Sequence, residues 1–325
     1  MPKQLFTPIQ LLPGAVGTIH VSEPEPQKQE DGRYSFNVSV KCKTRMNRKT
    51  RNMESDKIYN MDGLEIDKIY NIDCLEGMRQ MQAESVDLVV TSPPYDNLRT
   101  YNGYCFDFEN IAKELFRVVK DGGVVVWVVG DATIDGDETG TSFRQALYFK
   151  EIGFKLFDTM IYQKPPLGAV GNNTTYWQSF EYMFVFSKGK PKTINLICDR
   201  KNLDERAGDN GTKRLTDGSL LNVSRGGYGE YGRRTNVWQY LVGKGHSTKD
   251  DIAFKHPAIF PEALAADHIK SWSNEGDIVL EPFCGSGTTV KVARALHRHY
   301  IGFEISEEYC KIIEQRLNET RSLFD

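Results

Sequence analysis

Two consecutive prolines follow an apolar run in the sequence TSPPY (residues 91–95). The preceding run SVDLVV (residues 85–90) predicts a short buried strand, so the prolines lie where the chain leaves a sheet. Proline fixes φ and has no N–H, and it holds the residue before it in extended geometry. Ser92 is therefore expected to display its hydroxyl and carbonyl on a stiff elbow, which suits a site that positions a reactant.

A glycine-rich turn forms a second candidate site in EPFCGSGTT (residues 281–289), between a strand-like and a helix-like run. Backbone N–H groups at the start of such a helix face the ends of the strands and bind nucleotide-like ligands. The spacing is no Walker A loop, because Lys291 lies four residues beyond Gly287, and Val290 occupies the third glycine position of the dinucleotide fingerprint. We expect a ligand without phosphates, and a plain strand–turn–helix connection is the alternative.

Glu304 ends the strand-like run YIGFE, about 20 residues after the glycine turn. A carboxylate at the end of that strand can accept hydrogen bonds from both hydroxyls of a ribose. A strand-end glutamate is alternatively a solvated or helix-capping residue, but its offset from the turn favours ribose binding.

The elements that must position these residues alternate along the chain. Strand-like runs occur at residues 68–73, 85–90, 124–129, 154–162, 181–187, 277–282 and 300–304. Helix-like runs occur at residues 109–119, 142–153, 261–272, 287–296 and 306–324, and an Asp-Gly-Gly turn is expected at residues 121–123. Strands separated by helices of this length predict an α/β fold with a doubly wound, mostly parallel sheet.

The domain organisation follows from two stretches that lack this rhythm. Residues 1–55 predict an N-terminal extension with a flexible basic arm, and residues 188–250 predict a functional insertion or disorder. The remaining stretches, residues 56–187 and 251–325, form the two halves of the main domain.

The composition of the chain limits its possible partners and its cellular environment. The net charge is −3, so a polyanion would need a local basic surface. The 6 cysteines show no CxxC or metal-ligand spacing, which predicts reduced thiols, no disulfide and no metal site. No apolar run approaches the roughly 20 residues of a membrane span, so we expect a cytoplasmic protein without membrane contact.

Three motifs together resemble one family. TSPPY, EPFCGSGTT and KHPAIFPEAL (residues 255–264) are similar to motifs of the β-class S-adenosylmethionine-dependent DNA amino-methyltransferases, which methylate cytosine N4 or adenine N6. The catalytic motif precedes the cofactor motif, as in the permuted order of that family, and the resemblance covers residues 66–325. It implies a Rossmann-like methyltransferase fold, S-adenosylmethionine as cofactor, double-stranded DNA as substrate and residues 188–250 as target-recognition region. A homodimer and a partner restriction endonuclease are compatible with it.

The resemblance also assigns site residues. The catalytic motif matches Ser92, Pro93, Pro94 and Tyr95. The cofactor motifs match Asp73, His256, Pro257, Phe260, Glu281, Phe283, Gly285, Ser286, Gly287, Thr288 and Glu304. Glu281 departs from the family pattern, because Asp usually stands there.

The chemistry of an exocyclic amine fits these residues. Its lone pair is delocalised into the ring, so the site must draw it toward tetrahedral geometry, and Ser92 Oγ and the Pro93 carbonyl could accept its two N–H bonds. Tyr95 would stack on a base rotated out of the duplex, and transfer would proceed in line without a covalent intermediate. The chain has no Pro-Cys dipeptide, which argues against methylation of a cytosine ring carbon.

The insertion is rich in basic residues interleaved with Asn, Tyr and Gly. Arg reads guanine edges and Asn reads adenine edges in the major groove, although a solvated loop would have a similar composition. The candidate DNA-binding residues are Arg200, Arg206, Lys213, Arg214, Arg225, Arg233 and Arg234.

Ser before the prolines favours cytosine N4 over adenine N6, since family members with Asp there mostly act on adenine. A methyltransferase acting on RNA or protein, and a non-catalytic DNA-binding protein that keeps the cofactor pocket, are the rival hypotheses.

Overall fold

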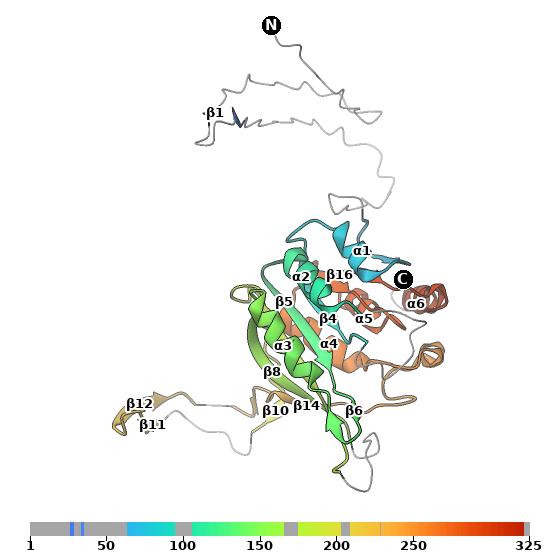
Figure 1. Cartoon of the computed structure of the whole chain (residues 1–325). Coiled ribbons are helices and arrows are strands. Elements are labelled where there is room, and N and C mark those ends of the chain that lie inside the picture. Colours follow the sequence, from blue (N-terminus) through green and yellow to red (C-terminus); the bar gives the residue numbers. More distant parts are fainter. Residues whose placement is uncertain are drawn as a thin grey trace, which may run out of the picture. The chain divides into compact units, whose positions relative to one another are not determined.

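The computed structural model describes residues 27–28, 34–35, 64–94, 106–165, 175–202, 209–227 and 229–321 (Figure 1). The chain divides into two compact units, Met1–Asp56 and Lys57–Asp325. In the first unit, β1 (Gln27–Lys28) pairs in antiparallel fashion with β2 (Tyr34–Ser35). The basic run KCKTRMNRKTRN (residues 41–52), which forms the predicted basic arm of the N-terminal extension, lies outside the described residues.

The second unit is built on an eight-stranded sheet with the order β14-β8-β9-β5-β4-β15-β16-β3. Its strands are β3 (Lys68–Tyr70), β4 (Val86–Thr91), β5 (Val119–Val129), β8 (Lys155–Gln163), β9 (Phe180–Ser187), β14 (Val237–Gln239), β15 (Ile278–Glu281) and β16 (His299–Phe303). Only β9 runs antiparallel to its neighbours β5 and β8, and all other pairs in this sheet are parallel. The predicted α/β fold with a mostly parallel sheet is confirmed.

Helices cover both faces of the sheet (Figure 1). The helices of one face are α1 (Cys74–Arg79), α2 (Phe108–Val118) and α3 (Thr141–Glu151), and those of the other are α4 (Glu262–Trp272), α5 (Thr288–Ala295) and α6 (Glu307–Arg321). Along β5, Val124 and Val126 pack toward α4 and α5, whereas Val125 and Trp127 pack toward α2 and α3. The central strands are therefore apolar on both faces, as expected of a covered parallel sheet.

The predicted Asp-Gly-Gly turn is part of a bulge and not a separate turn. β5 begins at Val119, opposite Val86, and the next paired residues are Val124 and Leu88. Residues 120–123 bulge out at this point, and Gly122 has a φ of 80°. The turn residues thus bend the strand without ending it.

The insertion contains short strands. β10 (Arg200–Lys201) pairs with β13 (Tyr231–Gly232), and β11 (Asp209–Arg214) pairs with β12 (Leu220–Arg225). β14 lies in the same stretch of sequence but joins the main sheet beside β8.

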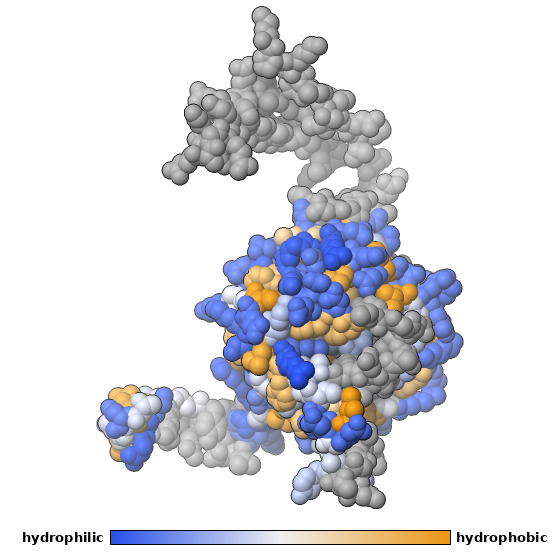
Figure 2. All heavy atoms as spheres, in the orientation of Figure 1, coloured by the Kyte–Doolittle hydropathy of each residue, from blue (hydrophilic) through white to orange (hydrophobic). Residues whose placement is uncertain are grey.

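The surface view shows hydrophilic residues over most of the visible face of the described sheet unit, with small separate hydrophobic areas (Figure 2). Among the described residues, no helix is long and apolar enough to cross a membrane.

Candidate active site

The Ser-Pro-Pro corner and the glycine turn lie side by side. β4 and β15 are parallel neighbours in the sheet, with Val89 opposite Leu280. Both strands therefore end at the same edge, where the Thr91 hydroxyl donates a hydrogen bond to the Glu281 carboxylate. Two motifs that are separated by 190 positions in the chain meet at this hydrogen bond.

A cavity of about 1130 Å³ opens at this edge. The predicted residues that line it are Ser92, Pro93, Pro94, His256, Pro257, Phe260, Glu281, Phe283, Gly285, Ser286, Thr288 and Glu304. Because β4 lies between β15 and β5, the Ser92 corner separates two sides of the lining. The glycine turn and the end of β16 form one side, which we call the loop side. The carboxyl ends of β5 and β8 and the beginning of β9 form the other side, which we call the hairpin side.

Two glycines shape the turn. Gly285 has a φ of 51°, and a side chain there would lie 3.0 Å from the ring of His256. Gly287 has a φ of 80° and is the N-cap of α5, where an added Cβ would lie 2.7 Å from the Ile313 side chain. Residues with a side chain rarely adopt positive φ, so this backbone path requires glycine. It allows a ligand to approach the backbone closely.

Glu304 lies directly after β16 and is 9% exposed. Its Oε2 accepts a hydrogen bond from the Gly285 N–H at 2.8 Å, and its Oε1 accepts one from the Ser306 N–H at 2.8 Å. Burial raises the pKa of this carboxyl above its usual range. Each carboxylate oxygen can accept more than one hydrogen bond, so Glu304 can brace the turn and also bind hydroxyls in the cavity.

Glu281 is buried beneath the turn at 5% exposure. Besides the Thr91 hydroxyl, its carboxylate accepts hydrogen bonds from the Thr289 hydroxyl at 2.7 Å and the Phe283 N–H at 3.1 Å. Burial nevertheless raises the pKa of Glu281 to about 8. This acid is therefore mostly protonated at neutral pH.

We expect Glu281→Gln to flatten the pH dependence of stability. Because the pKa of Glu281 is higher in the folded chain, at about 8, than its ordinary value of 4.5, its stabilising contribution is fully present below pH 4.5. That contribution decreases as the pH rises to 8, on the order of 1 kcal/mol per pH unit. Urea unfolding of both proteins between pH 5 and 9 measures this difference, and parallel stability curves would contradict the assignment.

Three predicted residues lie elsewhere. The Asp73 carboxylate caps α1, accepting hydrogen bonds from the N–H groups of Leu75 at 2.8 Å and Glu76 at 3.3 Å, while the neighbours of Asp73, Ile72 and Cys74, line the cavity. Gly287, the N-cap of α5, allows the bend of the turn but does not line the cavity. Tyr95 lies outside the described residues.

Among the predicted DNA-binding residues that the structure describes, none lines the cavity. Those with exposed side chains are Arg200, Lys213, Arg214 and Arg233. The Arg234 guanidinium instead forms ion pairs with Asp199 and Asp267 and lies 5.2 Å from the ring centre of Trp238. Arg206 and the side chain of Arg225 lie outside the described part of the chain.

The hairpin side contains polar residues that were not predicted. The Lys164 ammonium pairs with the Glu181 carboxylate, and both residues line the cavity. Asp131, which follows β5, also lines it, and its carboxylate accepts a hydrogen bond from the Ser142 N–H at 2.7 Å. Their positions at strand ends were visible in the sequence, but only the strand order places them opposite the glycine turn.

Comparison with known families gives a match for this chain. The family model described as DNA methylase matches residues 86–315. The chain belongs to the N6/N4 DNA methylase family, and the predicted resemblance is confirmed. It is 59% identical over 236 residues to the orphan methyltransferase M.BamHII of Bacillus amyloliquefaciens, an alignment that covers 72% of this chain and 89% of that protein. It is 26% identical over 287 residues to the type II methyltransferase M.SmaI of Serratia marcescens, an alignment that covers 76% of this chain and 89% of that protein.

Solved structures share the fold. The cytosine-N4-specific PvuII DNA methyltransferase matches with a TM-score of 0.55 at 21% identity, covering 79% of this chain and 90% of that one. A second match is TTHA0409 of Thermus thermophilus, a putative DNA modification methylase complexed with S-adenosyl-L-methionine. It has a TM-score of 0.52 at 21% identity and covers 78% of this chain and 93% of that one.

Proposed function

We propose that this DNA methyltransferase transfers a methyl group from S-adenosylmethionine to the exocyclic N4 of cytosine in duplex DNA. The observation that carries the proposal is the shared cavity, in which the Ser92 corner lies between the glycine turn and a second polar side. Such a cavity has room for a cofactor and a target base in contact.

The loop side has the groups that a sulfonium nucleoside requires. Glu304 can accept hydrogen bonds from the ribose hydroxyls, and the backbone next to Gly285 leaves space for a ligand. Phe283 and Tyr309 provide aromatic lining for an adenine ring. S-adenosylmethionine, when bound there, would supply a methyl group activated by its positive sulfur.

The Ser92 corner can activate the amine. Ser92 and Pro93 line the cavity, and among the described residues none donates a hydrogen bond to Ser92 Oγ or to the Pro93 carbonyl, so an amine bound in the cavity could donate to both oxygens. Hydrogen bonds from both amine N–H groups to these oxygens would localise the nitrogen lone pair for in-line attack. Ser92, rather than an ionised Asp at this position, favours cytosine.

The hairpin side would hold the extruded base. The Lys164 ammonium can donate a hydrogen bond to an acceptor on the edge of the base, such as cytosine O2. Tyr95, next to the corner in sequence, would stack on that base.

One experiment tests the transfer and the choice of amine together. The full chain is incubated with duplex DNA and labelled S-adenosylmethionine, and the DNA is digested and its nucleosides are identified by mass spectrometry. We expect N4-methylcytosine. N6-methyladenine would overturn the choice of amine, label on RNA or protein would overturn the substrate, and retained DNA without label would indicate a non-catalytic DNA-binding protein.

We further propose that the insertion binds DNA through its exposed cations. Replacing Arg200, Lys213, Arg214 and Arg233 together by Ala should raise the KM for DNA and lower the salt dependence of binding by about 0.9 per lost phosphate contact. The affinity for S-adenosylmethionine should stay unchanged. Fluorescence anisotropy with duplex DNA at several salt concentrations measures the slope.

Lys311→Ala is the matched control, since Lys311 is 70% exposed but lies on α6, outside the insertion. An unchanged slope in the fourfold variant would exclude these side chains from phosphate contact. A homodimer and a cognate endonuclease stay predictions.

A further inference from the structure

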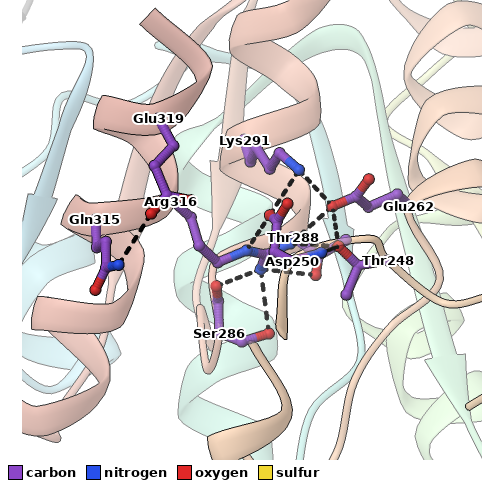
Figure 3. A network of polar contacts seen from close by, with 9 residues as sticks. All are labelled: Thr248, Asp250, Glu262, Ser286, Thr288, Lys291, Gln315, Arg316 and Glu319. Carbon is purple, nitrogen blue, oxygen red and sulfur yellow. Dashed lines mark hydrogen bonds and ion pairs between the residues drawn. The ribbon is translucent and has the colours of Figure 1, made fainter. Parts of the chain in front are cut away.

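Four charged residues, of which Arg316 is fully buried and the other three are partly buried, form a cluster behind the glycine turn (Figure 3). The Lys291 ammonium lies 2.7 Å from the carboxylates of both Asp250 and Glu262. The Arg316 guanidinium pairs with the same two groups, at 2.9 Å and 2.8 Å. Two cations thus face two anions, and we call these four residues the charge cluster.

Arg316 also holds the cofactor turn directly. Its side chain is fully buried, and its Nη1 donates a hydrogen bond to the Ser286 carbonyl at 2.5 Å. The same nitrogen lies 3.4 Å from Ser286 Oγ and 3.3 Å from Thr288 Oγ1. The planar guanidinium has five donors in fixed directions, so one side chain can bind the turn and both carboxylates at once.

The cluster joins the turn to the end of the insertion. Arg316 belongs to α6 and Lys291 to α5, whereas Glu262 begins α4 and Asp250 lies at the end of the predicted target-recognition region. Arg316 Nη2 also lies 3.4 Å from the Thr248 hydroxyl in that region. Figure 3 shows these side chains converging beside Ser286 and Thr288.

We propose that Arg316 is a positioning residue that fixes the Ser286–Thr288 turn for the cofactor, and that Asp250 connects this turn to the end of the insertion. The proposal rests on the proposed function, because it takes S-adenosylmethionine as the ligand of the turn. It assigns to Arg316 a role in cofactor affinity, although Arg316 does not line the cavity.

Charge balance alone requires a second cation beside Lys291, but it does not require that this cation be an arginine. Lys291 already contacts both carboxylates, but a lysine at position 316 could not reproduce the forked contact with the Ser286 carbonyl. Although burial by itself would raise the pKa of Asp250, hydrogen bonds from Lys291 and Arg316 lower it overall. Asp250 is therefore an anion that orients the guanidinium.

The test separates positioning from folding. Arg316→Met combined with Glu262→Gln removes one cation and one anion, which leaves Lys291 paired with Asp250. Titration calorimetry with S-adenosylmethionine should show a Kd at least about ten-fold higher than for the unmodified chain, the usual effect of losing a hydrogen bond to a charged group. The KM for the cofactor should rise in parallel, and kcat at saturating cofactor should change by less than about three-fold.

Further variants complete the series. Arg316→Lys, which keeps the charge, should raise the Kd by about three- to ten-fold, and Asp250→Asn should raise it in the same direction. Lys311→Met is the control, because Lys311 lies on the same helix in an exposed pair with Glu307 and should leave the Kd within about two-fold.

The outcomes are distinct. An unchanged cofactor Kd in both Arg316 variants would overturn the proposal, and so would a loss of kcat with an unchanged KM for the cofactor. Thermal unfolding identifies a double variant that fails to fold, in which case Arg316→Lys decides. Failure of the unmodified chain to bind S-adenosylmethionine would refute the proposed function instead.

Discussion

Alanine at both Ser92 and Tyr95 should reduce kcat by at least about 10³-fold while changing the Kd for S-adenosylmethionine by less than about three-fold. The Ser92 hydroxyl is one of two acceptors proposed to align the amine, and removing one positioned hydrogen-bonding group typically costs 10²–10³ in rate. Loss of base stacking at Tyr95 would add to this effect. Transfer of tritiated methyl groups to duplex DNA measures kcat, and titration calorimetry measures the cofactor Kd.

Ser85→Ala is the control for this pair. Ser85 directly precedes β4, and its hydroxyl donates a hydrogen bond to the Gln82 carbonyl at 2.9 Å, away from the lined cavity. Its loss should leave kcat within about two-fold. Full activity in the Ser92/Tyr95 variant would defeat the catalytic assignment, and loss of cofactor binding would indicate a collapsed pocket.

Gly287→Ala should weaken S-adenosylmethionine binding by at least about 30-fold, the second large effect we expect. The added Cβ would lie 2.7 Å from Ile313 at a φ of 80°, so the turn must move away from α6. That movement would disturb the hydrogen bond between Arg316 and Ser286. Titration calorimetry and thermal unfolding measure the two consequences.

Gly276→Ala is a matched comparison. Gly276 has a φ of 83°, but nothing lies within 4 Å of an added Cβ. It should cost about 1 kcal/mol of stability from backbone strain and leave the cofactor Kd unchanged. Equal cofactor affinity in the two alanine variants would show that the close contact at Gly287 has no bearing on the ligand.

Much of the fold was predictable from the sequence, because its central strands are covered on both faces and read as apolar runs. β4 and β5 are examples, and α2 shows a clear amphipathic pattern. α1 and β14 are too short to give a periodic pattern, and tertiary contacts define them. β14 also lies in a stretch whose Gly, Asn and Arg content indicated a functional insertion or disorder.

The candidate site was predictable where the residues that line it are neighbours in sequence. The Ser92 corner and the glycine turn are contiguous motifs, and the parallel sheet brings their strands together. The residues of the Lys164–Glu181 pair and of the charge cluster come from separate segments, so no local sequence pattern predicts these contacts. Glu281 was recognisable by position, but its raised pKa depends on burial that only the packed sheet reveals.

The strand order also bears on how the protein is made. β15 and β16, which emerge from the ribosome after the other strands of this sheet, lie between β4 and β3, which emerge before them. With strands spaced about 4.8 Å apart, the nascent sheet would have a gap of roughly 14 Å between β3 and β4 until the late pair arrives. Completion of the sheet must therefore follow synthesis of β16, which predicts slow folding dominated by contacts distant in sequence.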